Sequence, residues 1–249
     1  MDYRVVTGRE RNDIESLQQV IIKAAWPEFM NHDVYISRYW VTIYRRFPEY
    51  QYALLGSDDD RVLAIGNTLP LVWDDEPGDL PDRGLDWALE HCFNHLDSGM
   101  EYKVLCAFQI VVATDLLGRG LSYDGVREMI KVGREYGLKK LIAPVRPNQK
   151  SKYPLTPMIN YINWKNEQGL PFDGWMRVHA RLGAATVRVC PESMLIEGTP
   201  AEWELWTGIK FPESGEYIVP GALVPVKIDR ETNRGTYIEP NLWMVHTLR

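Results

Sequence analysis

The segment from Lys103 to Asn148 constrains the fold most, because it reads as two buried strands joined by a glycine turn and one helix. The run KVLCAFQIVVAT is too apolar for an edge strand, and KKLIAPV is a second buried run. Between them, DLLGRGLS leads into a helix whose apolar residues recur every three or four positions until Gly137. A right-handed crossover makes the two strands parallel neighbours, so the sequence predicts an α/β (α+β) protein.

The sequence before this unit predicts a strand, two helices and a hairpin. The strand covers residues 4–7, and an N-x-x-E signal at Asn12 precedes an apolar helical stripe from Ile14 to Ala24. Asp33 is placed to cap a second helix, which Pro48 ends. Alternation over residues 50–71 predicts a hairpin, and the acidic stretch WDDEPGDLPD predicts a surface loop before a helix over residues 84–96.

The sequence after the unit predicts a proline-containing loop, a helix over GWMRVHARLG and a strand over ATVRVC. A capping-box pattern at Thr199, Pro200 and Glu202 predicts the start of another helix. Residues 217–246 alternate around a polar turn and predict a terminal β-hairpin. This hairpin either pairs across a homodimer or covers the sheet of its own chain, and both placements stay open.

Charge and composition exclude several classes of protein. Of 249 residues, 28 are Lys or Arg and 34 are Asp or Glu, so a net charge of −6 gives no general attraction for phosphate backbones or anionic lipid. We therefore expect no nucleic-acid partner. No run approaches the roughly 18 apolar residues of a membrane span, and no apolar leader follows the N-terminus, so we expect no membrane partner either. Three scattered cysteines suit a reducing compartment, which predicts a cytoplasmic protein.

The turn LLGRGLS, residues 116–122, is the strongest functional motif. Gly118 and Gly120 allow a tight turn, so that several N–H groups and a helix N-terminus face one phosphate. The turn is not a Walker loop, since no G-K-[ST] follows, and the dinucleotide pattern G-x-G-x-x-G fails at Tyr123. The motif predicts an anion site, and a plain tight turn is the alternative interpretation.

This turn resembles the pyrophosphate signature R/Q-x-x-G-x-G/A of the GNAT superfamily of acyl-CoA-dependent N-acyltransferases. Gly120 matches the fourth position of the signature, whereas Leu117 and Ser122 depart from the first and last. The predicted order of elements over residues 1–190 is also that of a GNAT domain. The resemblance leaves insertions near residues 71–100 and 149–172, and a C-terminal extension over residues 191–249 packed on the same domain.

The resemblance implies a mixed, twisted sheet with helices on both faces, splayed between its fourth and fifth strands, plus the C-terminal hairpin. It implies acetyl-CoA or another acyl-CoA as the acyl donor. Independently of the resemblance, we expect no metal. The implied donor-binding residues are Val112 and Ala113 on the fourth strand, Leu117, Gly118, Arg119, Gly120, Leu121 and Ser122 in the turn, and Asn148 after the fifth strand.

The implied reaction is direct transfer of the acyl group to a primary amine of a small molecule or peptide. The fourth strand carries Gln109 where some members of the family have a glutamate, and a neutral amide cannot act as the base. Tyr153 follows Asn148 by five residues and is the implied acid for the leaving thiolate, with Tyr161 as its rival. Either ring alternatively packs in the core or binds the acceptor.

Several alternatives stay open at this point. The fold also serves S-acyltransferases and decarboxylases, and a non-catalytic acyl-CoA-binding module is the interpretation from a different class. Trp73 and Trp164, in the two insertions, are expected either in the core or over an acceptor groove. His91 and His95 have the spacing of a metal pair, but without a third ligand we expect an ordinary helix face.

Overall fold

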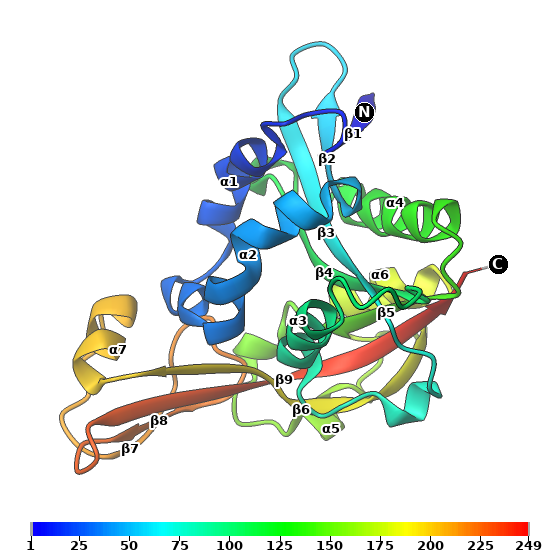
Figure 1. The fold of residues 1–249 in the computed structure, drawn as a ribbon. Coiled ribbons are helices and arrows are strands. Elements are labelled where there is room, and N and C mark those ends of the chain that lie inside the picture. The colour runs from blue at the N-terminus through cyan, green and yellow to red at the C-terminus, as the bar shows by residue number, and fades with distance from the viewer. Residues whose placement is uncertain (1, 249) are drawn as a thin grey trace.

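The computed structural model describes residues 2–248, which form one mixed sheet of nine strands (Figure 1). The strand order is β1-β2-β3-β4-β5-β9-β8-β7, and β6 pairs with β9 outside this path. Within the described residues, β4 and β5 are the one parallel pair. The strands are β1 Tyr3–Thr7, β2 Gln51–Gly56, β3 Val62–Leu71, β4 Val104–Val112, β5 Lys140–Val145, β6 Ala185–Gly198, β7 Gly215–Tyr217, β8 Val226–Asp229 and β9 Arg234–Thr247.

Helices cover both faces of the sheet, as predicted (Figure 1). The helices are α1 Ile14–Ala25, α2 Val34–Arg46, α3 Gly84–Asn94, α4 Leu121–Glu135, α5 Met158–Tyr161, α6 Gly174–Arg181 and α7 Pro200–Thr207, with a 3-10 turn, η1, at Glu28–His32. Helix α1 packs on β2, β3 and β4, and α2 packs on α3. On the opposite face α4 packs on β3, β4 and β5, and α6 packs on α4. None of the helices within residues 2–248 has the length and apolar character to cross a bilayer.

Local capping explains where two of the helices begin. The Asp33 carboxylate accepts the N–H groups of Tyr35 and Ile36, both at 2.9 Å, at the start of α2. Thr199 and Glu202 form the predicted capping box at the start of α7. The expected signal at Asn12 is wrong, because α1 begins after Asp13 and has no side-chain cap.

Strand β9 completes the centre of the sheet. Its residues 242–247 pair with β5 on one edge and largely with β6 on the other, while its first residues pair with β8 and the far end of β6. The last residues of β6, the first residues of β9, and strands β7 and β8 form a β-arm, on which α7 packs (Figure 1). The predicted hairpin is confirmed as β8–β9, and β9 lies within the sheet of its own chain, between β5 and β6, instead of covering that sheet. The domain boundary at residue 190 stays a prediction; in the sheet, β6 runs on to Gly198.

A second, smaller core fixes η1 against the β-arm. The Phe29 ring of η1 lies 5.7 Å from Trp203 of α7 and 5.5 Å from Tyr237 of β9, measured between ring centroids. All three side chains are buried. Offset and edge-on aromatic pairs of this kind hold the two segments in one relative position. The contacts of Phe29 thereby fix the position of η1 relative to α7 and β9.

Strands β4 and β5 separate after three residue pairs, which confirms the predicted splay. Val104–Cys106 pairs with Lys140–Ile142, and beyond this point no described strand pairs with that edge of β4. On its other edge, β4 carries a bulge: Asn67 of β3 faces Gln109, and the next residue of β3 faces Ala107. Phe108 is therefore an extra residue, and the bulge re-aims the side chains beside it.

Candidate active site

The splay opens a cleft of about 660 Å³ between the two strands. Its walls are residues 107–112 of β4, residues 143–146 from β5 and its end, the start of α4, and α6. Since this edge of β4 has no partner strand, its backbone N–H and C=O groups are free to bind a ligand. The cleft is therefore built to hold an extended molecule along β4.

The glycine turn lies at one end of the cleft and has the geometry of an anion site. Gly118 and Gly120 adopt φ values of +79° and +88°, a region that favours glycine. No acceptor within residues 2–248 takes the N–H groups of Gly118, Gly120, Leu121 and Ser122. These donors and the positive end of α4 point to a bound phosphate.

Seven of the nine predicted donor-binding residues line the cleft: Val112, Leu117, Gly118, Gly120, Leu121, Ser122 and Asn148. The other two are not among its lining residues. Ala113 is buried, and its N–H donates to the Leu63 carbonyl at 3.0 Å. Arg119 is exposed beside the turn, where it places one positive charge near the anion site.

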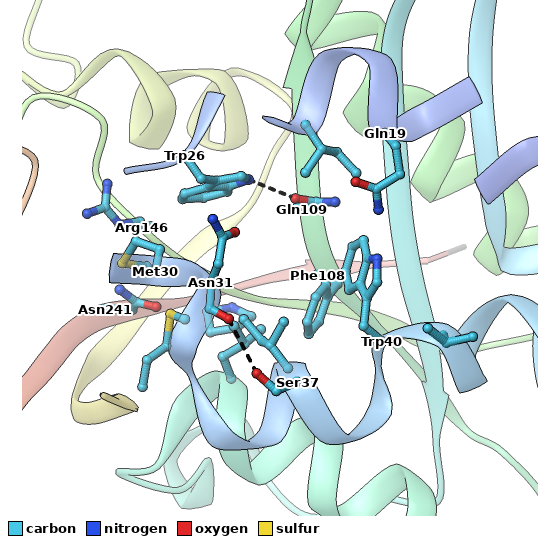
Figure 2. A pocket seen from close by; sticks show the side chains of 16 residues that line it. Gln19, Trp26, Met30, Asn31, Ser37, Trp40, Phe108, Gln109, Arg146 and Asn241 are labelled. Carbon is cyan, nitrogen blue, oxygen red and sulfur yellow. Dashed lines mark hydrogen bonds between the residues drawn. The ribbon is translucent and has the colours of Figure 1, made fainter. Parts of the chain in front are cut away.

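A second cavity of about 330 Å³, the inner cavity, lies on the α1 and α2 side of the sheet (Figure 2). Its walls are mainly aromatic and aliphatic, with a few amide and hydroxyl groups. The lining residues are Gln19, Ile22, Trp26, Met30, Asn31, Ile36, Ser37, Trp40, Val41, Leu85, Phe108, Gln109, Pro144, Arg146, Met194 and Asn241.

The cleft and the inner cavity meet at one wall, the shared wall, formed by Trp26, Phe108, Gln109, Pro144 and Arg146. The bulge in β4 brings both Phe108 and Gln109 to it. Trp26 Nε1 donates to Gln109 Oε1 at 3.0 Å (Figure 2). A ligand in the cleft and a ligand in the inner cavity would touch at this wall.

A buried ion pair holds Arg146 at the shared wall. Arg146 Nε donates to both carboxylate oxygens of Glu239 at 2.9 Å, and Nη2 donates to the Gly221 carbonyl at 2.7 Å. Glu239 is fully buried and also accepts from Tyr237 and Asn241. The guanidinium lies 5.6 Å from the Trp26 ring centroid. Arg146 is thereby fixed in position, and its charge is compensated.

Two more carboxyl groups, Asp33 and Asp86, are buried next to residues that line the inner cavity. Burial, together with the nearby Asp33, raises the pKa of Asp86 to about 9. Asp86 Oδ2 accepts the Leu195 N–H at 3.0 Å, whereas Asp86 Oδ1 and Asp33 Oδ2 have no donor partner in the described chain. Burial also raises the pKa of Asp33, so both carboxyl groups are harder to ionise than in water.

Tyr153 and Tyr161 lie in an aromatic cluster apart from both cavities. The Tyr153 ring packs edge-on against Trp164 at 4.9 Å between centroids. The Tyr161 hydroxyl donates to Asp173 Oδ2 at 2.8 Å and is buried. Neither ring is among the residues that line the cleft or the inner cavity. The acid role of Tyr153 stays a prediction.

Neither Trp73 nor Trp164 is among the residues that line the cleft or the inner cavity. Trp164 belongs to the tyrosine cluster, and Trp73 is buried with Trp87 edge-on at 6.5 Å. The histidine pair binds backbone: His91 Nε2 donates to the Val72 carbonyl at 2.7 Å, and His95 Nδ1 donates to the His91 carbonyl at 2.9 Å. Among residues 2–248, no three ligating side chains come together.

The walls of the inner cavity were missed at the level of sequence. Trp26 and Trp40 look like core positions of two amphipathic helices, and Phe108 looks like one apolar residue of a buried strand. Gln109 stands out in the sequence as a polar residue of an apolar strand, and Arg146 gives a second signal, because this cation stands directly after a buried strand. Asn241 comes from the far end of the chain, and no local pattern joins it to the others.

Comparison with known proteins identifies the family. No protein-family model matches the chain. The chain is 30% identical over 253 residues to the arginine N-acetyltransferase avaD of Aspergillus versicolor, covering 91% of this chain and 87% of that protein.

Solved structures show the same fold. The loading GNATL domain of CurA from Lyngbya majuscula has a TM-score of 0.61 at 19% identity, over 100% of this chain and 98% of that one. The GphF GNAT-like decarboxylase in complex with isobutyryl-CoA has a TM-score of 0.55 at 11% identity, over 100% of both chains. The predicted fold and family are confirmed, and the chain belongs to the GNAT superfamily of acyl-CoA-dependent N-acetyltransferases.

Proposed function

We propose that this N-acetyltransferase moves the acetyl group of acetyl-CoA to the primary amine of arginine or of a closely related small amino compound. The observation that carries the proposal is the shared wall, where the cleft and the inner cavity meet. A donor in the cleft and an acceptor in the inner cavity would have their reacting atoms beside Phe108 and Gln109. The similarity to an arginine N-acetyltransferase supports this choice of acceptor.

The donor fits the cleft at two places. The unpaired N–H groups of Gly118, Gly120, Leu121 and Ser122 would bind the pyrophosphate, and Arg119 adds a nearby positive charge. The open edge of β4 up to Val112 would pair with the amide groups of the pantetheine arm. Leu117 contributes backbone here, since its side chain carries no charge. Asn148 lines the opposite wall of the same cleft.

The inner cavity suits a cation with an aliphatic stem. Trp40 and Phe108 offer aromatic rings, which attract ammonium and guanidinium groups. The inner cavity also carries amide and hydroxyl groups, Gln19, Asn31, Ser37, Gln109 and Asn241, which offer hydrogen-bond acceptors to such a ligand. A cavity of about 330 Å³ fits a free small molecule better than a folded peptide segment.

The chemistry requires the amine in its neutral form. Its nitrogen attacks the acyl carbon, a C–N bond forms and the C–S bond breaks. The nitrogen gives a proton to water, and the sulfur leaves with a proton, so the products are an amide and free CoA. The shared wall consists of Trp26, Phe108, Gln109, Pro144 and Arg146, and none of these is a base at neutral pH. The pKa of the acceptor amine therefore governs the pH dependence of the rate.

An assay for released thiol tests the proposal. The purified protein is given acetyl-CoA with L-arginine, agmatine, L-ornithine or Nα-acetyl-L-arginine, and mass spectrometry locates the new acetyl group. We expect release of CoA with L-arginine and none with Nα-acetyl-L-arginine, whose α-amine is blocked. Absence of release with every amine would overturn the proposal. A parallel sample with malonyl-CoA and no amine tests decarboxylation, the other reaction associated with this fold.

A further inference from the structure

A chain of four amide side chains, the amide chain, runs from the interior of the sheet to the shared wall. Its members are Gln18 of α1, Gln51 of β2, Asn67 of β3 and Gln109 of β4. The first three are completely buried, whereas Gln109 is half-buried and lines both the cleft and the inner cavity. The amide chain therefore connects a sealed interior with the place where the reaction occurs.

Backbone carbonyls fix the orientation of the two inner amides. Gln51 Nε2 donates to the carbonyls of Phe47 and Thr68, both at 3.0 Å, so Gln51 Oε1 must face Asn67. Gln18 Nε2 donates to the Tyr52 carbonyl at 2.9 Å, so Gln18 Oε1 must also face Asn67. A carbonyl accepts only, and neither glutamine can be turned around without setting oxygen against oxygen.

The orientation of Asn67 in turn determines that of Gln109. Its Nδ2 donates to the Oε1 atoms of Gln18 and Gln51, both at 2.8 Å, so its Oδ1 is left as an acceptor. Gln109 Nε2 donates to that oxygen at 2.8 Å. Gln109 Oε1 must then face the shared wall, where it accepts from Trp26 Nε1. An indole N–H can only donate. The hydrogen bond from Trp26 therefore requires the same orientation of Gln109 as the hydrogen bonds in the interior do.

We propose that Gln109 Oε1 binds an N–H of the acceptor amine and that the rest of the amide chain is its positioning device. This inference rests on the proposed N-acetyl transfer. An amide oxygen accepts two hydrogen bonds, and within residues 2–248 this one receives a single bond, from Trp26. A primary amine bound through one N–H keeps its lone pair free to attack the acyl carbon. Gln109 orients the amine and takes no proton from it.

Two substitutions test the role of this oxygen. Gln109→Met keeps the length of the side chain and removes the acceptor, and Gln168→Met on the exposed surface is the matched control. We expect Gln109→Met to lower kcat/KM for the amine about threefold to tenfold, the range for one lost hydrogen bond between neutral groups. The Kd of acetyl-CoA should stay within about twofold, and the Gln168→Met variant should match the wild type.

The second substitution, Gln109→Glu, tests whether the orientation of the group at position 109 controls the reaction. In its protonated form the new carboxyl group donates to Asn67 Oδ1 and presents C=O to the amine, as glutamine does. After ionisation it sets oxygen against oxygen and becomes a base at the wall. The profile of kcat/KM against pH should therefore contain one ionisation that the wild type lacks. A variant profile that equals the wild-type profile multiplied by one constant factor would contradict the proposed role.

The outcomes distinguish the two proposals. A wild-type protein that acetylates no amine refutes the proposed function. If the wild type is active, a Gln109→Met variant within twofold of it in kcat/KM refutes the role of Gln109. A Gln109→Glu variant without the additional ionisation refutes it too, and this test applies even if Gln109→Met does not fold.

Discussion

Replacing Asn67 by leucine removes the junction of the amide chain and should destabilise the folded protein strongly. Asn67 donates both Nδ2 hydrogens, to Gln18 and Gln51, and accepts from Gln109 through Oδ1, while the Tyr44 hydroxyl lies 3.2 Å from Nδ2. Leucine has a similar shape, so little of the effect comes from a change of volume. After the substitution Gln51 Oε1 loses its partner in a fully buried place, and Gln109 Nε2 loses its partner at the wall. Gln18 Oε1 keeps the hydroxyl of Tyr44 at 2.7 Å.

Two orphaned polar groups, at about 1–3 kcal/mol each, predict a loss of about 2–6 kcal/mol in the free energy of unfolding. That is a large part of the roughly 5–15 kcal/mol that holds a domain folded. Urea titration followed by tryptophan fluorescence measures the loss. Thr68→Val is the control, because buried Thr68 donates one hydrogen bond, to the Tyr50 carbonyl, and its loss should cost about 1 kcal/mol. A cost for Asn67→Leu no larger than that of the control would refute the reasoning.

Three further predictions concern the anion site and the buried carboxyl pair. Gly120→Glu should abolish the thermal stabilisation by acetyl-CoA, which is about 2.7 kcal/mol at 100 times Kd, because φ is +88° there and the added charge repels phosphate; retained stabilisation would place the donor elsewhere. Leu117→Arg, at a side chain that is 66% exposed, should tighten acetyl-CoA binding about two- to fivefold at low ionic strength, and titration calorimetry in about 0.5 M salt should show the gain lost. Asp86→Asn should make stability less dependent on pH: the pKa of Asp86 is about 9 in the folded protein and about 4 when unfolded, so the wild type loses stability as pH rises between these values. Urea titrations at pH 5 and pH 8 check this, and an equal loss in both proteins would contradict it.

Features that depend on interactions between residues close together in the sequence could be predicted. The turn at residues 116–122 was readable because Gly118 and Gly120 are needed for local backbone geometry, and both have positive φ. Asp33 was readable as a cap because the N–H groups that it binds lie two and three residues further on. The splay of β4 from β5 came from the family resemblance rather than from periodicity.

Features that depend on contacts between residues far apart in the sequence could not be predicted. Arg146 and Glu239 are 93 residues apart, and Gln18 reaches Asn67 across 49 residues. In the sequence a glutamine in a helix looks like a surface residue, and nothing local shows that it will be buried. Trp73 was visible as a tryptophan in an acidic loop, yet its ring packs inward against Trp87. Aromatic residues in loops are ambiguous because burial depends on what the rest of the chain brings to them.

The central position of β9 sets the order in which this site can be assembled during synthesis. Residues 242–247 pair with the whole length of β5, whose end supplies the Ala143–Arg146 wall of the cleft. The ribosome makes β5 about a hundred residues before it makes β9. Until then, the edge of β5 that will pair with β9 is an unpaired apolar strand edge of the growing chain. Glu239, the partner of Arg146, also comes from this late segment. The reactive wall is thus closed only after β9 has been made, and a nascent chain that stops before β9 exposes a strand edge that favours aggregation.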